Sequence, residues 1–324
     1  MHAILCREHG GPDVMQYTEI DQPRPAAGEV VIESEAIGVN YVDTMRRSGR
    51  HPSAPKPPFT PGIEVCGRVV AVGDDVTKFQ PGDRVIGRCV SHGAYAEFVC
   101  VEERFTVACP EAIDSEQGAA LFVTGQTALH ALQTIGQVQP KETVLITAAA
   151  GGVGTCAVQI AKLLGAQVIA AAGSNEKCQL ARDNGADAAI NYSRSGWPEQ
   201  VRDATAGRGV DLIIESVGGE IAAASIACWA PGGRMVIFGK ASGQAATISG
   251  DDLLFGNRTV HGLAVGAVIE NEPVMRHAMD QLTAWLNEGQ LHLHIGQTYP
   301  LQHAPEAHRD LEARHTTGKL VLKP

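Results

Sequence analysis

The sequence predicts a two-domain α/β protein in which a doubly wound parallel sheet is inserted into a mainly antiparallel β domain. Its 324 residues exceed the usual size of a single domain. Residues 1–118 contain short Val- and Ile-rich runs separated by Gly and Pro, which is typical of antiparallel strands. From 119 to 265, apolar strands alternate with amphipathic helical segments, the pattern of a parallel sheet. Residues 266–324 are expected to rejoin the first domain.

The composition is that of an ordinary soluble globular protein, with 44% hydrophobic and 19% charged residues. The net charge of −10, without any basic run, leaves no electrostatic footprint for a nucleic acid. No apolar stretch approaches the ~18 residues that a bilayer-spanning helix needs. Eight cysteines without a C-x-x-C pair favour buried free thiols over a disulfide framework. We therefore expect a cytoplasmic protein that acts on small molecules and has no nucleic-acid or membrane partner.

The individual elements follow from periodicity and from turn residues. In the first domain, strand-like runs occupy 29–40, 64–76, 82–90 and 94–103, and five prolines within 51–61 predict a rigid loop. In the second domain, strands are predicted at 142–150, 167–173, 188–192, 209–218, 232–239 and 258–266, and helices at 152–165, 176–185, 198–206 and 219–230. The last part predicts a helix over 272–288 and a strand-like tail over 318–324. The apolar face of that helix is expected to hold Val274, Ala278, Leu282, Trp285 and Leu286.

A glycine-rich turn lies between the strand at 142–150 and its helix. The turn reads Gly151, Gly152, Val153 and Gly154. A glycine at 151 lets the backbone approach a pyrophosphate, and one at 154 lets the helix pack closely on the sheet. The first amides of the helix then face the anion. The alternative is a tight structural turn, but the strand, turn and helix context favours a dinucleotide site.

Several further motifs, spread over nearly the whole chain, show a family resemblance. They are G38-V-N-Y-V-D-T, P61-G-I-E-V-C-G, G82-D-R-V, G93-A-Y-A-E, T124-G-Q-T-A, A148-A-A-G-G-V-G, G185-A-D, I190-N-Y and G318-K. With these motifs the chain resembles the zinc-free medium-chain dehydrogenases/reductases, most closely the NADPH:quinone oxidoreductase (zeta-crystallin-like) group. The resemblance implies a GroES-like catalytic domain (1–118 and 266–324), a Rossmann domain (119–265), and a homodimer that pairs through the strand at 258–266.

The residues that bind catalytic zinc in alcohol dehydrogenases of this superfamily are missing. Two of those places read Asn40 and Ile63, which are a poor ligand and a non-ligand for zinc. Cys89 and His92 stand alone, so we expect no metal. Without a Lewis acid, simple ketones and alcohols are poor substrates. A quinone or an enone spreads the incoming negative charge and needs less assistance.

The resemblance also implies roles for individual residues. Asn40 is expected to be a hydrogen-bond donor near the nicotinamide, with a turn-capping amide as the alternative. Tyr41, Arg47 and His51 are expected to flank the substrate cleft; alternatively, Tyr41 is core, Arg47 is a surface charge and His51 is exposed. The remaining cofactor contacts expected from the family are Thr124, Thr127, Ser216, Phe238, Gly239 and Lys319. The C-terminal histidines are expected to be exposed: His292, His294, His303 and His308.

The sequence after the second strand of the parallel sheet favours NADPH over NADH. An NAD-specific domain ends this strand with an acidic residue that binds the ribose. Here the strand ends at Gly173, followed by Ser174 and, in the first turn of the next helix, Lys177. The resemblance implies that Ser174, Lys177 and Tyr192 hold the 2′-phosphate. The alternative is that Lys177 is a solvated helix residue and Tyr192 a capping aromatic.

Together these observations predict an NADPH-dependent reductase that transfers hydride to quinones or α,β-unsaturated carbonyls without zinc. One alternative is an enoyl thioester reductase. It would need a cationic groove, and this acidic chain contains no basic run that indicates one. Another is a cofactor-binding structural or regulatory protein with the same fold. Consumption of NADPH in the presence of an acceptor distinguishes an enzyme from such a protein.

Overall fold

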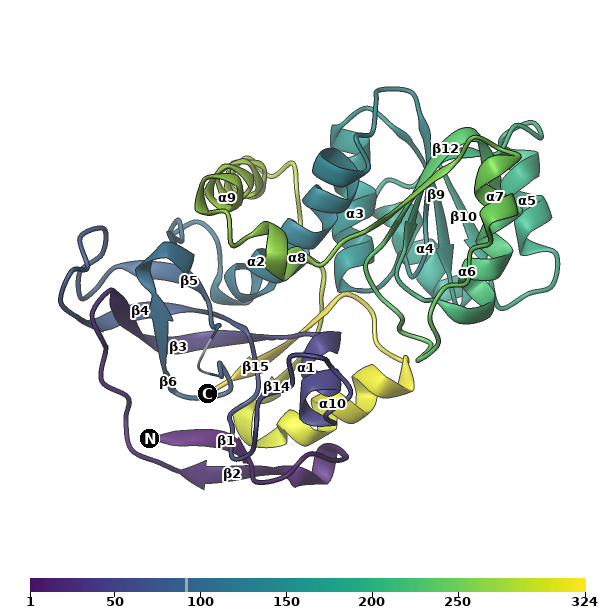
Figure 1. Ribbon diagram of the computed structural model, residues 1–324. Helices are drawn as coiled ribbons and strands as arrows, with labels where there is room; N and C mark the ends of the chain where they lie inside the picture. The colour runs from purple at the N-terminus through teal and green to yellow at the C-terminus, as the bar shows by residue number, and fades with distance from the viewer. Residues whose placement is uncertain (91–92) are drawn as a thin grey trace. The chain divides into compact units, whose positions relative to one another are not determined.

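The computed structural model describes residues 1–90 and 93–324, which form two compact units (Figure 1). The first unit contains Met1–Val123 and Glu272–Pro324, and the second contains Thr124–Asn271. The sequence placed the two boundaries a few residues earlier, after 118 and after 265. In the structure the first boundary falls within helix α2 (Ser115–Leu129), so this helix begins in one unit and ends in the other.

The first unit is built on a mainly antiparallel sheet with the order β14-β15-β3-β4-β5-β7, in which β6 also pairs with β3. Its long central strand β3 pairs with β4, β6 and β15, and only β14 and β15 are parallel. The strands of the sheet are β3 (Glu29–Val39), β4 (Glu64–Val72), β5 (Arg84–Arg88), β6 (Phe98–Glu102), β7 (Thr106–Ala108), β14 (Ile295–Pro300) and β15 (Lys319–Lys323). A separate hairpin consists of β1 (His2–Cys6) and β2 (Met15–Glu19). The predicted β domain with a C-terminal strand is therefore present.

Three helices complete the first unit besides the start of α2: α1 (Tyr41–Arg47), α9 (Glu272–Asn287) and α10 (Ala304–Ala313). Helix α9 matches the helix predicted over 272–288. Its buried face is rotated by about one position from the predicted one, because Met275 and Met279 are buried whereas Val274 and Trp285 are half-buried. Long flexible methionine side chains fill this interface in place of the branched and aromatic ones.

The second unit is the predicted doubly wound sheet. Its six strands are all parallel and follow the order β10-β9-β8-β11-β12-β13. The strands are β8 (Thr143–Ile146), β9 (Gln167–Ala172), β10 (Ala188–Asn191), β11 (Val210–Glu215), β12 (Trp229–Ile237) and β13 (Thr259–Gly262). The helices are α3 (Gly152–Leu163), α4 (Asn175–Asp183), α5 (Trp197–Ala204), α6 (Gly219–Ile226), α7 (Gly250–Leu254) and α8 (Val265–Val268). Helices α3 to α7 lie around the sheet in Figure 1.

The strand order of the second unit determines where a ligand can bind. Counted along the chain, the order is 3-2-1-4-5-6, so the chain reverses its direction of winding between β8 and β11. Right-handed crossovers put helices on opposite faces on the two sides of this point and open a crevice at the carboxyl ends of the strands. The core beneath is apolar and includes Leu145, Ile169, Ile213 and Met235 from four adjacent strands.

All eight cysteines are free and buried, which confirms the prediction of free thiols. Within the part of the chain that the structure describes, no helix has both the length and the apolar composition needed to cross a bilayer.

Candidate active site and cofactor site

Asn40, Glu64 and Lys319 form a buried polar cluster in the first unit. Asn40 directly precedes α1, Glu64 opens β4 and Lys319 opens β15. The Nζ of Lys319 donates to Oε1 of Glu64 at 2.5 Å and to Oδ1 of Asn40 at 2.6 Å. The Nδ2 of Asn40 donates to the same Glu64 oxygen at 2.8 Å. Because both charged side chains are almost fully buried, each charge is balanced mainly by the other.

The backbone around Glu64 donates a hydrogen bond to its carboxylate and leaves space for it. Its second oxygen, Oε2, accepts the backbone N–H of Val123 in α2 at 2.8 Å. A Cβ at Gly38 of β3 would collide with the carboxylate and with the carbonyl oxygen of Ala119. This close approach explains the glycine of the motif that begins at Gly38. Removing one member of a buried ion pair typically costs about 3–5 kcal/mol, so the cluster stabilises the fold only when it is complete.

The partners of Asn40 determine the orientation of its amide. An ammonium only donates and a carboxylate only accepts, so Oδ1 faces Lys319 and Nδ2 faces Glu64. The amide carries two N–H bonds, and one of them is used on Glu64. The second is therefore the group that Asn40 can offer to a ligand.

A second buried network links α1 to α10. The Arg47 guanidinium donates to Nδ1 of His308 at 3.0 Å, so the proton of the neutral imidazole is on Nε2. That Nε2–H donates to the Tyr95 hydroxyl at 2.9 Å, and the hydroxyl donates to Oδ2 of Asp43 at 3.3 Å. The same Asp43 oxygen accepts the backbone N–H of Asn40 at 2.8 Å. This series of hydrogen bonds thus ends at Asn40, which belongs to both networks.

Burial shifts the pKa values of two members of this second network, His308 and Asp43. It lowers the pKa of His308 to about 3, and the positive charge of Arg47 acts in the same direction. It raises the pKa of Asp43 to about 6, although the hydrogen bond from the Asn40 backbone opposes this. His308 is therefore neutral throughout the physiological range, as the tautomer assigned above requires.

Several residues lie elsewhere than the sequence suggested. His308 is buried, so the expectation that it is exposed was wrong: α10 packs against α1 and encloses it. Arg47 is also buried, where it bonds the carbonyl of Gly10, His308 and Glu312, so it is not a surface charge. His51 is half-buried, with Nδ1 bonded to Ser53 at 2.9 Å, and Tyr41 is half-buried at the start of α1. The roles of Tyr41, Arg47 and His51 at a substrate cleft stay predictions.

Metal-binding side chains do not gather in the described ranges 1–90 and 93–324, which contain no group of three or more His, Cys, Asp or Glu suited to a metal ion. Asn40 is committed to Lys319 and Glu64, and Ile63 is a hydrocarbon. Cys89 is buried, whereas His92 lies outside the described residues.

In the second unit, the glycine-rich turn joins β8 to α3 at the carboxyl edge of the sheet. A Cβ at Gly154 would collide with the backbone of Ala148 and Ala149, so close packing inside the protein requires this glycine. A Cβ at Gly151 would meet only the Ala148 carbonyl oxygen, at 3.4 Å. The chain itself therefore does not require glycine at 151. An open position beside the helix N-terminus suits the backbone approach of a pyrophosphate.

Five of the other predicted cofactor residues of this unit follow the carboxyl ends of its strands. Ser216 follows β11, and Phe238 and Gly239 follow β12; a Cβ at Gly239 would lie 2.8 Å from the Ser216 carbonyl oxygen. Gly152 and Val153 form the first turn of α3, beside the same crevice. Thr124 and Thr127 are buried one turn apart on α2. Each of these side chains stays a predicted cofactor contact.

At the end of β9, Ser174, Lys177 and Tyr192 come close together. Ser174 is the N-cap of α4, and its Oγ accepts the backbone N–H of Lys177 at 3.2 Å. A Cβ at Gly173 would lie 3.6 Å from the Tyr192 hydroxyl, so the ring covers the strand end. Partial burial lowers the pKa of Lys177. A cation in the first turn of a helix opposes the helix dipole, and a bound anion would relieve that opposition.

Sequence reasoning missed four residues of the buried networks: Asp43, Glu64, Tyr95 and His308. Asp43 and Glu64 were visible as single acids in apolar motifs, and a buried acid requires a partner. Lys319 was expected at the cofactor, and the structure joins it to Asn40 and Glu64.

Comparison with known proteins agrees with this architecture. Residues 26–111 match the family described as "Alcohol dehydrogenase GroES-like domain", and residues 152–286 match "Zinc-binding dehydrogenase". A GroES-like domain joined to a Rossmann sheet defines the medium-chain dehydrogenases/reductases, so the predicted fold class is confirmed.

Relatives that match over the full length of the chain identify its family within this class. The chain is 38% identical over 322 residues to a Pseudomonas aeruginosa quinone oxidoreductase, covering 99% of both, and 35% identical to one from Sus scrofa, covering 99% of this chain and 97% of that protein. The solved Escherichia coli quinone oxidoreductase, complexed with NADPH, superposes with a TM-score of 0.95 at 34% identity and full coverage of both chains. The chain therefore belongs to the quinone oxidoreductase family and is an oxidoreductase.

The neutral buried His308 predicts a specific loss of stability in acid. Its pKa is about 3 in the fold against an ordinary value of 6.5, so between these values the unfolded chain binds a proton that the fold excludes. The free energy of unfolding therefore falls as the pH is lowered through this window. Asp43 acts in the opposite direction, since its pKa is raised from 3.8 to about 6 and the fold retains its proton longer.

Urea unfolding of the wild type, His308→Gln and the exposed control His292→Gln at pH 7 and pH 5 measures this effect. The wild type and the control are expected to lose about 2 kcal/mol more than His308→Gln between the two pH values. An equal loss in all three proteins would contradict the assignment of a neutral buried imidazole.

Proposed function

We propose that this protein uses NADPH to reduce quinones and other conjugated carbonyl compounds, and that it does so without zinc. The observation that carries the proposal is the Asn40 amide, whose oxygen is held by Lys319 and whose one remaining N–H can donate. A donor fixed in advance stabilises negative charge as it develops on an acceptor oxygen. Relatives named quinone oxidoreductases support the substrate class.

The Asn40 cluster supports a zinc-free reaction. In this cluster an ammonium group already balances the Glu64 carboxylate, and the Asn40 oxygen accepts from the same ammonium. A divalent cation would have to displace Lys319 from a buried position beside Glu64, and in the two places that hold zinc in alcohol dehydrogenases it would meet the neutral Asn40 amide and the hydrocarbon side chain of Ile63. The residues present therefore do not fit a catalytic zinc site, although a family model that matches the chain is named for zinc.

Residues of the second unit support NADPH as the cofactor. The open position at Gly151 and the α3 N-terminus suit a pyrophosphate. Ser174, Lys177 and Tyr192 offer two hydroxyls and a cation for a 2′-phosphate, and no carboxylate ends β9. When bound, NADPH would supply the hydride. The Escherichia coli relative and a mycobacterial structure at 37% identity and a TM-score of 0.95 are both complexed with NADPH.

We also infer a cytoplasmic homodimer. Strand β13 is the edge of the parallel sheet, and all four of its residues are exposed. Val260 on this strand and the nearby Leu254 and Phe255 are exposed apolar side chains, which suits an edge that pairs with the same strand of a second copy. The eight free thiols suit a reducing compartment.

Sedimentation velocity is expected to show twice the 34.1 kDa chain mass; a stable monomer would contradict the dimer.

The proposed chemistry predicts which substrates are accepted. With NADPH, 1,4-benzoquinone and a conjugated enone are expected to be reduced at rates unchanged by prior incubation with a metal chelator. Ethanol with NADP⁺ is expected to give no turnover, because an amide N–H polarises a simple carbonyl or alkoxide much less than a metal ion does. A preference for enoyl thioesters over quinones would favour the alternative reductase. NADPH binding without turnover of any acceptor would favour a structural or regulatory role.

The 2′-phosphate assignment predicts that Lys177→Ala weakens NADPH and spares NADH. A charge-assisted hydrogen bond contributes about 1.5–3 kcal/mol, so the dissociation constant for NADPH is expected to rise about tenfold to a hundredfold. The control is Lys162→Ala, a lysine of α3 that pairs with Asp187 at 2.8 Å. The measurement is calorimetric titration of each protein with NADPH and with NADH. An equal rise in the dissociation constants of both cofactors would show that Lys177 does not recognise the phosphate.

A further inference from the structure

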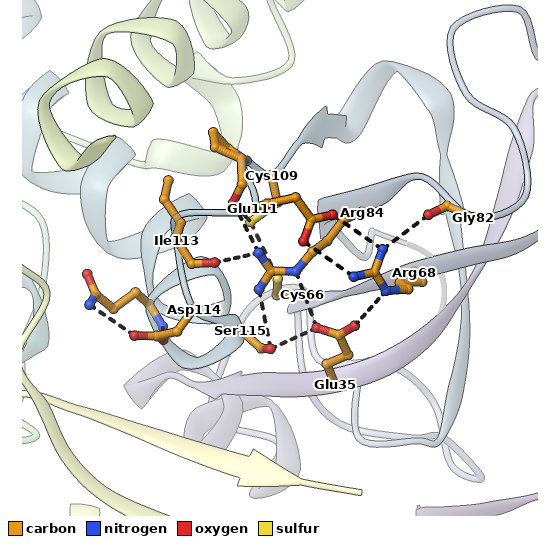
Figure 2. Close-up of polar contacts among 12 residues, drawn as sticks. Glu35, Cys66, Arg68, Gly82, Arg84, Cys109, Glu111, Ile113, Asp114 and Ser115 are labelled. Atoms are coloured by element: carbon orange, nitrogen blue, oxygen red, sulfur yellow. Dashed lines mark hydrogen bonds and ion pairs between the residues drawn. The ribbon is translucent and has the colours of Figure 1, made fainter. Parts of the chain in front are cut away.

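Two cysteines far apart in the sequence lie together beneath the start of α2. Cys66 is on β4 and Cys109 directly follows β7 (Figure 2). The Sγ of Cys66 donates a hydrogen bond to the Sγ of Cys109 at 3.8 Å. Cys66 is completely buried and Cys109 is 5% exposed. A small oxidant therefore reaches the pair first at Cys109.

The surroundings make the two sulfurs chemically different. The hydrogen bond from Cys66 lowers the pKa of the Cys109 thiol, and the nearby Arg84 guanidinium lowers it further, against the effect of burial. The same hydrogen bond and burial raise the pKa of Cys66. Of the two thiols, Cys109 is therefore the one that ionises more readily, and in its protonated form its S–H donates to the Pro110 carbonyl oxygen at 3.8 Å. A thiolate beside a cation is the arrangement found in reactive cysteines.

Arg84 also holds the segment that carries Cys109. Residues 109–114 belong to no strand or helix. The Arg84 guanidinium donates to the carbonyl oxygens of Pro110, at 3.0 Å, and Ile113, and to the Ser115 hydroxyl at 3.3 Å (Figure 2). The Ser115 hydroxyl and Arg84 both bond the Glu35 carboxylate, at 2.7 and 3.4 Å. This segment is therefore held by the Arg84 and Glu35 side chains and, at Cys109 itself, by the backbone hydrogen bond from its N–H to the Arg84 carbonyl oxygen at 2.9 Å.

Helix α2 rests directly on the two sulfurs. A Cβ at Gly118, in its first turn, would lie 2.6 Å from the Cys66 sulfur and 3.3 Å from the Cys109 sulfur. The same helix supplies the Val123 amide to Glu64. A movement of either sulfur therefore acts first on the N-terminal turn of α2.

We propose that Cys66 and Cys109 are a site of reversible oxidation, at which hydrogen peroxide converts the two thiols into a disulfide. The Cys109 thiolate attacks one peroxide oxygen, the O–O bond breaks, and hydroxide leaves while Cys109 becomes a sulfenic acid. The Cys66 sulfur then attacks the Cys109 sulfur. The S–S bond forms, and the sulfenic oxygen leaves as water with the Cys66 proton. The hydroxide takes up the proton that Cys109 had lost, so two thiols and one peroxide give one disulfide and two waters.

The geometry indicates that this disulfide is easily reduced. A disulfide bond is about 2.05 Å long, so the sulfurs must approach by roughly 1.8 Å. Cys66 cannot move easily, because it pairs in register with Ile86 in the middle of the sheet. Cys109 has to move instead, against the contacts of Arg84 with its segment. A disulfide that strains its surroundings has a higher reduction potential and is the labile kind.

The test is peroxide treatment of the full chain, followed by alkylation of the remaining thiols in denaturant and by peptide mapping. Trypsin separates the two cysteines into peptides 51–68 and 105–141, each with a single cysteine. The expected result is the loss of two of the eight alkylatable thiols, a cross-linked 51–68/105–141 peptide pair, and full recovery on treatment with dithiothreitol. Retention of all eight thiols, or a loss without this cross-link, would overturn the proposal.

Single substitutions test the order of the two steps. In Cys66→Ser, peroxide is expected to leave Cys109 as a sulfenic acid that dimedone traps, and in Cys109→Ser, Cys66 is expected to stay reduced. Cys228→Ser is the matched control, a buried thiol whose pKa burial raises to about 12 and whose sulfur donates to backbone carbonyls; it is expected to lose the same two thiols as the wild type. Dimedone labelling of Cys66 in Cys109→Ser would show that Cys109 is not the attacking sulfur. The wild-type map decides the proposal even if a variant fails to fold.

Discussion

The buried ion pair of Glu64 and Lys319 is the interaction on which the first unit depends. It joins the first residues of β4 and β15, receives the α2 amide of Val123, and requires a glycine at 38. Buried ion pairs seldom add stability over an apolar core, but a broken one is costly, so the arrangement specifies a single geometry. In that geometry the Asn40 amide has a fixed orientation and one N–H left for a ligand.

The second unit solves a different physical problem, the binding of a large anionic molecule by an acidic protein. It relies on local features of the backbone and not on net charge: a helix N-terminus, an open glycine position, and a lysine in a helix first turn. The reversal of winding between β8 and β11 brings these features to one edge of the sheet. The overall charge of −10 therefore does not conflict with a phosphate-bearing cofactor.

The sequence predicted what depends on local patterns. Alternating periodicity located the parallel sheet, and the turn before α3 located Gly154, whose role is steric and local. It could not pair Glu64 with Lys319, which are 255 positions apart and meet only because β15 returns to β3. It was wrong about His308 because spacing alone does not show that α10 packs on α1. Long-range packing buried these groups, and at His308 burial lowers the pKa to about 3.

The most direct test of the central claim is a double-mutant cycle on kcat for quinone reduction with Asn40→Ala and Lys319→Arg. Lys319→Arg keeps the positive charge beside Glu64 but replaces the ammonium that holds the Asn40 oxygen. If Lys319 acts by orienting Asn40, each single variant lowers kcat and the double variant is no slower than Asn40→Ala alone. Additive losses from the two substitutions would contradict the account, because Lys319 would then act independently of Asn40.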